Sequence, residues 1–332
     1  MKRHASMSQT VEGDHPHPHT LQATIPDRLP APLVRRLSAI DPARATRAIG
    51  AEWGMIVAAV LVSAWGFAEN PLVYGLAVMF IGARQHALAI IGHDAVHFRL
   101  FGNRALNDAL GNLLVAWPIF MDVPTFRRFH GSHHRHLGTE EDENRRLWNT
   151  HNAAGELTRE WRFPKSAGGL VAVLAGRGAF LTGIWWIVRS LAGMVLFRIS
   201  WAPVAVRVAY YATILGIVSM LGGWSMVLWY WLTPFCTWYI VIHYVRLICE
   251  HSAIPSDEGA YGQTRTTLAG PLERLFVLPR NVHFHIEHHW YPSVPWYNLP
   301  ALHHALMAQP GFRDRAVVTP SMMASLRQCV RS

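Results

Sequence analysis

The chain has 332 residues, which allows one large domain or two small ones. Hydrophobic residues make up 51% of it and charged residues only 15%. An average soluble domain is about a quarter charged, so this composition indicates a protein in contact with lipid. The 20 histidines are unusual, because each neutral imidazole can bind a metal. The cysteines show no CxxC pairing and indicate neither a disulfide framework nor a zinc–thiolate site; they are Cys236, Cys249 and Cys329.

The polar segment 1–50 precedes the apolar part of the chain. It is rich in proline and arginine and has no apolar core, so no secretory signal peptide is expected. Its tract "HPHPH" (15–19) cannot form a helix, because proline fixes φ and lacks an N–H donor. We favour a partly disordered tail over a weak metal site there. The expected division is therefore a tail (1–50), a membrane domain (51–310) and a C-terminal tail (311–332).

Four apolar segments follow, at 53–68, 71–92, 206–221 and 224–245. A membrane-spanning helix needs about 20 residues, which the first and third segments reach with their flanks. Only "EN" separates the first two and only "GG" the last two, so we expect four transmembrane helices in two hairpins. A further apolar stretch, 178–197, carries Arg near its centre. Because a charge in mid-span is costly, we expect an interfacial amphipathic helix there rather than a fifth span.

The 30 Lys and Arg residues are unevenly distributed, and the two hairpin turns hold none of them. The positive-inside bias therefore predicts that both termini and the long middle segment lie in the cytoplasm, and we expect a bacterial inner membrane as the setting. The net charge of +9 alone would suggest nucleic acid. Its distribution instead makes it a topology signal, so no nucleic-acid partner is expected.

Three histidine-rich boxes lie near the predicted membrane edge. They read "HDAVH", "HGSHH" and "HIEHH", and a ninth histidine ends "RLICEH" after the last apolar segment. Residues three or four apart share a helix face, so each box is expected to aim its imidazoles at one point. By the predicted topology all nine lie on the cytoplasmic side: His93, His97, His130, His133, His134, His251, His285, His288 and His289.

This pattern predicts metal binding, and its size suits two ions. A zinc ion takes at most four ligands, or three in a catalytic site, so nine imidazoles are too many for one ion. Imidazole suits iron, copper, zinc and nickel alike, so the spacing leaves the metal open. A metal transporter would place its ligands near the membrane midplane, and a haem carrier needs one or two axial histidines per haem. Both classes, and a purely structural role, are therefore disfavoured.

The boxes resemble those of the integral-membrane fatty acid desaturases, which carry HxxxH, HxxHH and HxxHH in this order. The likeness extends to "HDAVHFRLFGNRALNDALGNLL" (93–114), "FRRFHGSHHRHLGTEEDEN" (126–144) and "NVHFHIEHHWYPSVPWYNLPALH" (281–303). It covers roughly residues 50–310. The resemblance implies an all-α integral membrane protein, with four transmembrane helices in two hairpins and a cytoplasmic helical cap that carries the boxes.

The resemblance also implies a non-haem di-iron centre that uses O₂ and two electrons per turnover, with all nine histidines as catalytic metal ligands. Some relatives add an asparagine ligand one helical turn before the histidine at 251; this chain has Leu247 there, and His243 or a water is the alternative. His86, two turns before the first box, is a candidate for lining a substrate channel. Four carboxylates beside the boxes are candidates for orienting imidazoles: Asp94, Asp142, Glu250 and Glu287.

The implied reaction is the O₂-dependent introduction of a double bond into a fatty acyl chain carried by lipid, coenzyme A or acyl carrier protein. The same boxes serve hydroxylases and other C–H oxidases, so hydroxylation, or desaturation of a non-lipid metabolite, stays open. The polar N-terminal segment lacks the histidine motif of a fused cytochrome b5 domain, so the expected electron donor is a separate ferredoxin or similar carrier with its reductase. The substrate, the bond position and the oligomeric state stay open.

Overall fold

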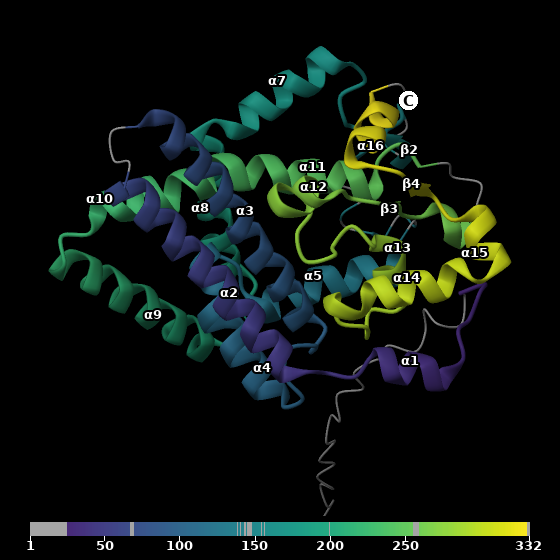
Figure 1. Cartoon of the computed structure of the whole chain (residues 1–332), viewed down its shortest axis with the longest axis horizontal. Coiled ribbons are helices and arrows are strands. Elements are labelled where there is room, and N and C mark those ends of the chain that lie inside the picture. The colour runs from purple at the N-terminus through teal and green to yellow at the C-terminus, as the bar shows by residue number, and fades with distance from the viewer. Residues whose placement is uncertain are drawn as a thin grey trace, which may run out of the picture.

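The computed structural model describes residues 25–330, apart from 67–69, 138, 140, 143, 145–147, 154, 156, 199 and 255–258. The His–Pro tract that was predicted to be disordered lies outside these residues. Within them the fold is mainly helical, as predicted, with two short two-stranded sheets in addition. Long helices fill one side of the molecule, and short helices from the N- and C-terminal segments gather on the other (Figure 1).

The N-terminal part consists of α1 (Ala31–Leu37), α2 (Pro42–Leu61), the π-helical η2 (Val62–Gly66) and α3 (Pro71–Val96). The two long helices begin alike. The side chain of Asp41 or Asn70 accepts backbone N–H groups of the first turn, and proline follows at the first helical position. α2 packs along α3 (Figure 1). Every residue from 81 to 96 is buried, so the C-terminal half of α3 lies inside the protein.

The middle segment bends sharply twice. It consists of α4 (Arg104–Gly111), η3 (Asn112–Ala116), η4 (Trp117–Ile119), α5 (Val123–His136), β1 (Asn149–His151), β2 (Leu157–Trp161), α7 (Ala167–Gly178) and α8 (Phe180–Leu196). Asp122 caps α5 by accepting the Thr125 N–H at 2.9 Å. The bend before α5 is 87° and the bend between α7 and α8 is 64°. β1 and β2 pair antiparallel.

The second pair of long helices starts with α9 (Trp201–Met220). The return path is α10 (Trp224–Val227), the π-helical turns η5 (Leu228–Leu232) and η6 (Phe235–Tyr239), and α11 (Ile240–His251). Gly222 adopts φ +63° in the turn between them, a conformation that suits glycine. η6 packs against α3 and α8, so this return path lies at the centre of the bundle.

The C-terminal part folds back onto α11 and α3. It consists of η7 (Gly259–Gly262), β3 (Thr266–Thr267), α12 (Pro271–Phe276), α13 (His285–Trp290), η8 (Trp296–Asn298), α14 (Leu299–Met307), α15 (Pro310–Arg315), β4 (Val318–Thr319) and α16 (Met322–Cys329). β4 pairs in parallel with β3. One hydrophobic cluster joins α1 with α13, α14 and α15, and α16 packs on α11.

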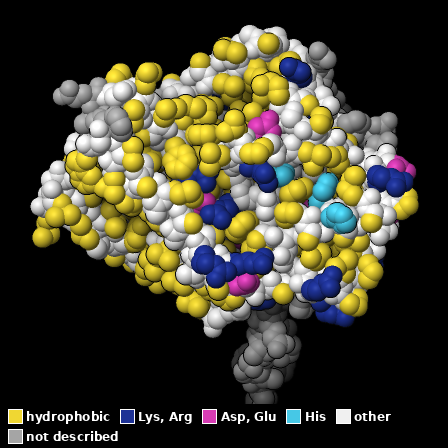
Figure 2. All heavy atoms as spheres, viewed as in Figure 1, with side chains coloured by type: hydrophobic (Ala, Val, Ile, Leu, Met, Phe, Trp, Pro, Cys, Tyr) yellow, Lys and Arg dark blue, Asp and Glu magenta, His cyan; other side chains and the backbone are white. Residues whose placement is uncertain are grey.

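Among the described residues, four helical stretches are long and apolar enough to cross a membrane, and they overlap the four predicted apolar segments. They are Pro42–Gly66, Pro71–Val96, Trp201–Met220 and Trp224–His251. The number rises to six if each of the two bent pairs is one span. The stretch predicted to be an interfacial helix forms α8 in one of these bent pairs. Hydrophobic side chains dominate the side of the molecule where α9 and α10 lie, whereas arginine and histidine gather on the other (Figure 2).

Helices cross both predicted domain boundaries, because α2 starts before residue 51 and α15 starts at Pro310. The described residues of both predicted tails also contribute to the core, with Leu29 and Leu37 from one and Phe312 and Cys329 from the other. The division into a membrane domain and two tails stays a prediction.

Candidate metal centre

All nine histidines predicted as ligands converge where α3, α5, α11 and α13 meet. Eight are buried and His97 is half-buried. They form two groups, in each of which the nitrogens that face inward lie within 4.8 Å of one another. The five-histidine group is His93, His97, His130, His134 and His288, and the four-histidine group is His133, His251, His285 and His289.

Each HxxHH box divides its histidines between the two groups, so the expectation that a box aims at one point is wrong for these two boxes. It is confirmed for the first box, because His93 and His97 belong to the same group. The outer histidines of the second box, His130 and His134, belong to the five-histidine group, whereas His133 belongs to the other. In the third box the outer histidines, His285 and His289, belong to the four-histidine group, and His288 belongs to the five-histidine group. With 3.6 residues per turn, positions i and i+4 differ by about 40° around a helix, whereas i+3 and i+4 differ by about 100°. The outer pair therefore shares a direction that the middle histidine cannot share.

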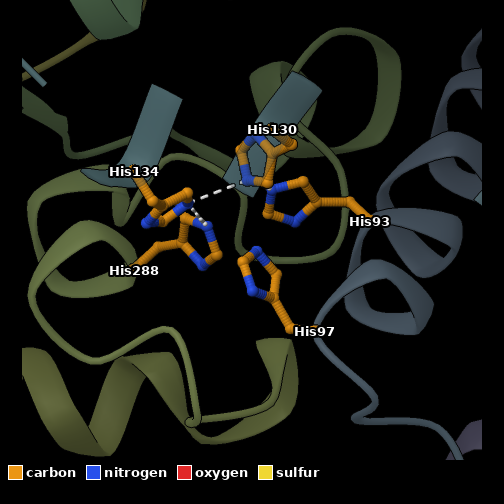
Figure 3. Close-up of side chains that lie close together, drawn as sticks. All are labelled: His93, His97, His130, His134 and His288. Carbon is orange, nitrogen blue, oxygen red and sulfur yellow. Dashed lines mark hydrogen bonds between the residues drawn. The ribbon is translucent and has the colours of Figure 1, made fainter. Parts of the chain in front are cut away.

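The five-histidine group is closely spaced (Figure 3). Nε2 of His130 lies 2.6 Å from Nε2 of His93 and 2.8 Å from Nε2 of His134. Nε2 of His288, from α13, lies 3.0 Å from Nε2 of His134. Imidazoles from three helices and from the residue that follows α3 thus point toward one small volume.

The histidines of the four-histidine group are also closely spaced. Nε2 of His285 lies 2.9 Å from Nε2 of His251 and 3.1 Å from Nε2 of His289. The ring of His133 completes the group, with its centroid 5.1 Å from that of His251 and 4.9 Å from that of His289. His251, which lies outside the boxes, therefore stands beside the box histidines.

These distances fit nitrogen ligands around an ion. Two nitrogens that are each about 2.1 Å from a metal, at right angles, lie about 3.0 Å apart. Metal ligation also requires the neutral imidazole. Burial lowers the pKa of His97 to about 3. Burial, together with neighbouring imidazoles, holds the pKa values of His288 and His289 well below the ordinary value. The residues therefore offer neutral, converging nitrogen donors.

Two of the four predicted carboxylates contact box histidines. Nδ1 of His133 lies 2.9 and 3.0 Å from the two carboxylate oxygens of Asp142. Nδ1 of His285 lies 3.5 Å from Oε1 of Glu250, which also accepts a hydrogen bond from Nε of Arg246 at 2.6 Å. The hydrogen bond to Asp142 fixes the proton of His133 on Nδ1 and leaves Nε2 for an ion, and the nearby carboxylate of Glu250 favours the same arrangement in His285.

The other two carboxylates bind different partners. Asp94 accepts the backbone N–H of Trp296 at 2.9 Å. Glu287, although it lies inside the third box, accepts a hydrogen bond from Nδ1 of His303 at 2.5 Å and one from the Thr266 hydroxyl at 2.5 Å. Sequence proximity to a box therefore did not identify which carboxylates touch its imidazoles.

Sequence reasoning did not identify the contact that holds the end of α3 in place. Arg127, on α5, donates two hydrogen bonds to Asp108 on α4, at 2.6 and 2.9 Å. It also donates to the carbonyls of Ala95 and Val96, at 3.0 and 2.7 Å. These carbonyls are among the last of α3, and that of Ala95 also accepts the Phe98 N–H at 3.0 Å and the Asn107 side-chain amide at 2.9 Å. Arg127 thereby ties the first box to the helix of the second.

His243 and His86 lie in neither group. Their ring centroids are 5.9 Å apart, between α11 and α3, and Tyr239 lies against both rings. The alternative in which His243 supplies a ligand in place of the missing asparagine is therefore not supported by its position. His86 lies about two turns before His93 on α3, and His243 lies about two turns before His251 on α11. Two turns correspond to about 11 Å along a helix.

The fold and the ligand groups agree with what the chain is similar to. The family model described as fatty acid desaturase matches residues 69–320, which is most of the chain. The chain belongs to the fatty acid desaturase family. It is therefore an oxidoreductase of a non-haem iron family, and its apolar helices associate it with a membrane.

Curated relatives are similar at low identity. Dihydrorhizobitoxine desaturase from Bradyrhizobium elkanii is 27% identical over 72% of this chain and 69% of its own length. Beta-carotene 4-ketolase 3 from Haematococcus lacustris is 25% identical over 64% of this chain and 57% of its own. The sn-1 acyl-lipid omega-3 desaturase (ferredoxin) from Nostoc sp. is 22% identical over 74% and 70%. The names of these relatives cover more than one substrate and more than one reaction.

Proposed function

We propose that this protein is an O₂-dependent membrane desaturase that introduces a double bond into a fatty acyl chain, with its nine histidines as the ligands of two iron ions. The convergence of nine buried imidazoles into two adjoining groups carries the proposal. Two separate groups suit two ions, and family membership favours iron. The lipid-named desaturase among the relatives supports an acyl substrate.

Iron bound here would activate O₂ to remove hydrogen from an unactivated carbon. The chain's own residues position the ions and exclude water, since the groups are buried beneath α5 and α13. Desaturation removes two hydrogens from neighbouring carbons. These hydrogens, with two electrons and two protons from a donor, reduce one O₂ to two waters. We infer a separate ferredoxin-like donor, which the ferredoxin-named relative supports.

We further propose that both termini and the metal centre face the cytoplasm, in a bacterial inner membrane. The five-histidine group lies at the C-terminal end of α3 and the four-histidine group at that of α11, at the opposite ends of these apolar stretches from the turns at residues 70 and 221–223. Those turns carry no Lys or Arg, which favours the non-cytoplasmic side for them.

A second candidate is an oxygen-inserting reaction on the same residues. The carotene ketolase among the relatives supports it, because its name indicates a product that carries added oxygen. A desaturase that acts on a non-lipid metabolite is a further candidate, supported by the dihydrorhizobitoxine desaturase.

The decisive experiment compares lipids and polar metabolites by untargeted mass spectrometry in cells that contain the wild type, His288→Ala or His304→Ala. His288 belongs to the five-histidine group, whereas His304 is exposed on α14 and serves as the matched control. A product that lacks two hydrogens, present with the wild type and His304→Ala but absent with His288→Ala, supports the acyl desaturase if it is an acyl lipid. A product that gains oxygen supports the second candidate. Identical profiles, in a host with ferredoxin and its reductase, would contradict the proposal.

A further inference from the structure

The two histidine groups differ in the carboxylates around them. Two of the four imidazoles in the four-histidine group contact a buried carboxylate: His133 contacts Asp142 and His285 contacts Glu250. Among the residues that the structure describes, no carboxylate forms an ion pair with a histidine of the five-histidine group. Two elements supply these carboxylates: α11 carries Glu250, and Asp142 lies in the segment after α5. The carboxylate on α13, Glu287, contacts His303 instead.

Both carboxylates are themselves held in place. Asp142 is 3% exposed, and its Oδ1 also accepts the backbone N–H of Asn144 at 3.0 Å. Glu250 is 2% exposed and is fixed by Arg246, one helical turn earlier on α11. Each carboxylate is therefore held in a fixed position beside one imidazole and is shielded from water.

A carboxylate that accepts the Nδ1 proton of an imidazole makes the other nitrogen a stronger donor to a metal. Removing such a partner typically lowers metal affinity or activity by about 10- to 100-fold. The buried carboxylate of Asp142 also favours the more highly charged ion there, because buried charges are weakly screened, whereas Arg246 offsets the charge of Glu250. The five-histidine group has more imidazoles but lacks this assistance within the described residues.

We propose that the two metal sites are chemically inequivalent, and that Asp142 and Glu250 are positioning residues that govern metal binding at the four-histidine site alone. The iron at that site is then easier to oxidise than its neighbour, and it is lost selectively when the carboxylates are neutralised. This inference rests on the proposed iron centre, but it concerns which residues control each ion rather than which substrate is oxidised.

The test uses the full chain, purified in detergent and loaded with ⁵⁷Fe, with Asp142→Asn and Glu250→Gln made singly and together. Glu287→Gln is the matched control, because that buried carboxylate sits inside a box but contacts His303. Iron per chain is measured by mass spectrometry of the metal, and the two sites are separated by Mössbauer spectroscopy. The wild type and the control are expected to hold two irons with two distinct signals.

The double variant is expected to keep one iron per chain, with one signal lost and the other unchanged, because affinity at one site falls about 10- to 100-fold. The single variant Asp142→Glu keeps the negative charge and should retain part of the Mössbauer signal that Asp142→Asn loses. A general loss of folding would not produce this difference. Equal loss of both signals, or two irons with unchanged spectra, would overturn the inference and leave the proposed function standing. A wild type that binds no iron would instead overturn the proposed function and the inference with it.

Discussion

The buried carboxylate of Glu52 and the half-buried guanidinium of Arg280 form an ion pair between residues 228 positions apart in the sequence. Oε1 of Glu52 accepts a hydrogen bond from Nε of Arg280 at 2.6 Å. Oε2 accepts one from Nη1 of Arg84 at 3.2 Å. Glu52 is fully buried on α2, Arg84 lies on α3, and Arg280 lies just before the third box. One carboxylate therefore connects the first two long helices to the segment that delivers α13.

Replacing Glu52 by Gln should destabilise the protein strongly. The change leaves the buried guanidinium of Arg84 and the half-buried guanidinium of Arg280 without their shared negative partner, and breaking a buried pair costs about 3–5 kcal/mol. Thermal unfolding in detergent, followed by tryptophan fluorescence, would measure the loss. Asp314→Asn is the control, because Asp314 pairs with Arg313 on the exposed surface, where ion pairs contribute about 0–1 kcal/mol. Equal shifts for the two variants would contradict this account.

Gly183→Ala should displace α8 from the bundle. A Cβ atom at this position would lie 2.2 Å from Cα of Cys236 and 2.5 Å from its Cβ, and neither atom can move without the backbone of η6. Overpacking of this kind costs about 1–3 kcal/mol or more. The expected result is a lower unfolding temperature and a smaller yield of folded protein from membranes. Gly176→Ala on α7, where nothing lies within 4 Å of the added methyl group, should leave both unchanged.

Arg127→Lys should loosen the first box while preserving the charge. Lysine cannot bind Asp108 with two parallel hydrogen bonds and at the same time reach the carbonyls at the end of α3. We expect a loss of about 1–3 kcal/mol in stability, since buried or partly buried acceptors lose their donors. Unfolding by denaturant would measure it. The neighbouring Arg128 is exposed, so Arg128→Lys is the matched control. Full stability in Arg127→Lys would show that the interaction does not hold α3.

The metal-free protein should lose stability as the pH falls below about 6.5. An unfolded histidine has a pKa of about 6.5, whereas burial lowers the pKa of His97 to about 3 in the folded state. Between these values the unfolded chain binds a proton that the folded chain does not, so stability is fully present above pH 6.5 and falls toward pH 3. Each such histidine contributes about 1.4 kcal/mol per pH unit within that window.

The pH dependence can be assigned by comparing the metal-free wild type with His97→Asn. The slope of the unfolding free energy against pH should be smaller in the variant by about 1.4 kcal/mol per pH unit, which corresponds to one proton. Unfolding curves at several pH values from 7 to 4.5 provide the comparison. Identical slopes would show that His97 is not held neutral in the folded chain.

Local periodicity was enough to predict the four apolar helices, and the box spacing together with the family resemblance predicted which nine histidines gather in one place. Hydrophobic runs bounded by Asn70–Pro71 or by glycine pairs fix helix ends through capping and through φ, which are local effects. The division of each HxxHH box between two groups also follows from helical angles, although it requires knowing that α5 and α13 each lie between the two groups. That knowledge comes from tertiary packing, which one box alone does not contain.

Local sequence patterns could not predict which side chains contact each other when the residues lie far apart in the sequence. Glu287 lies between box histidines yet binds His303, because its direction on α13 points away from the imidazoles. Arg127 and Asp108 are 19 residues apart, and no spacing rule joins them. The β3–β4 pair was likewise not predicted, since two-residue strands are set by the chain that they meet rather than by their own sequence.

The order of the nine histidines along the chain decides when the two groups can be completed during synthesis. The five-histidine group needs His93 and His288, and the four-histidine group needs His133 and His289. A growing chain that has already inserted all four long apolar helices, the last of which ends at His251, still lacks part of each group. Neither group is complete until α13 has left the ribosome, so on the proposed function both ions would be bound only after the four long helices have been synthesised.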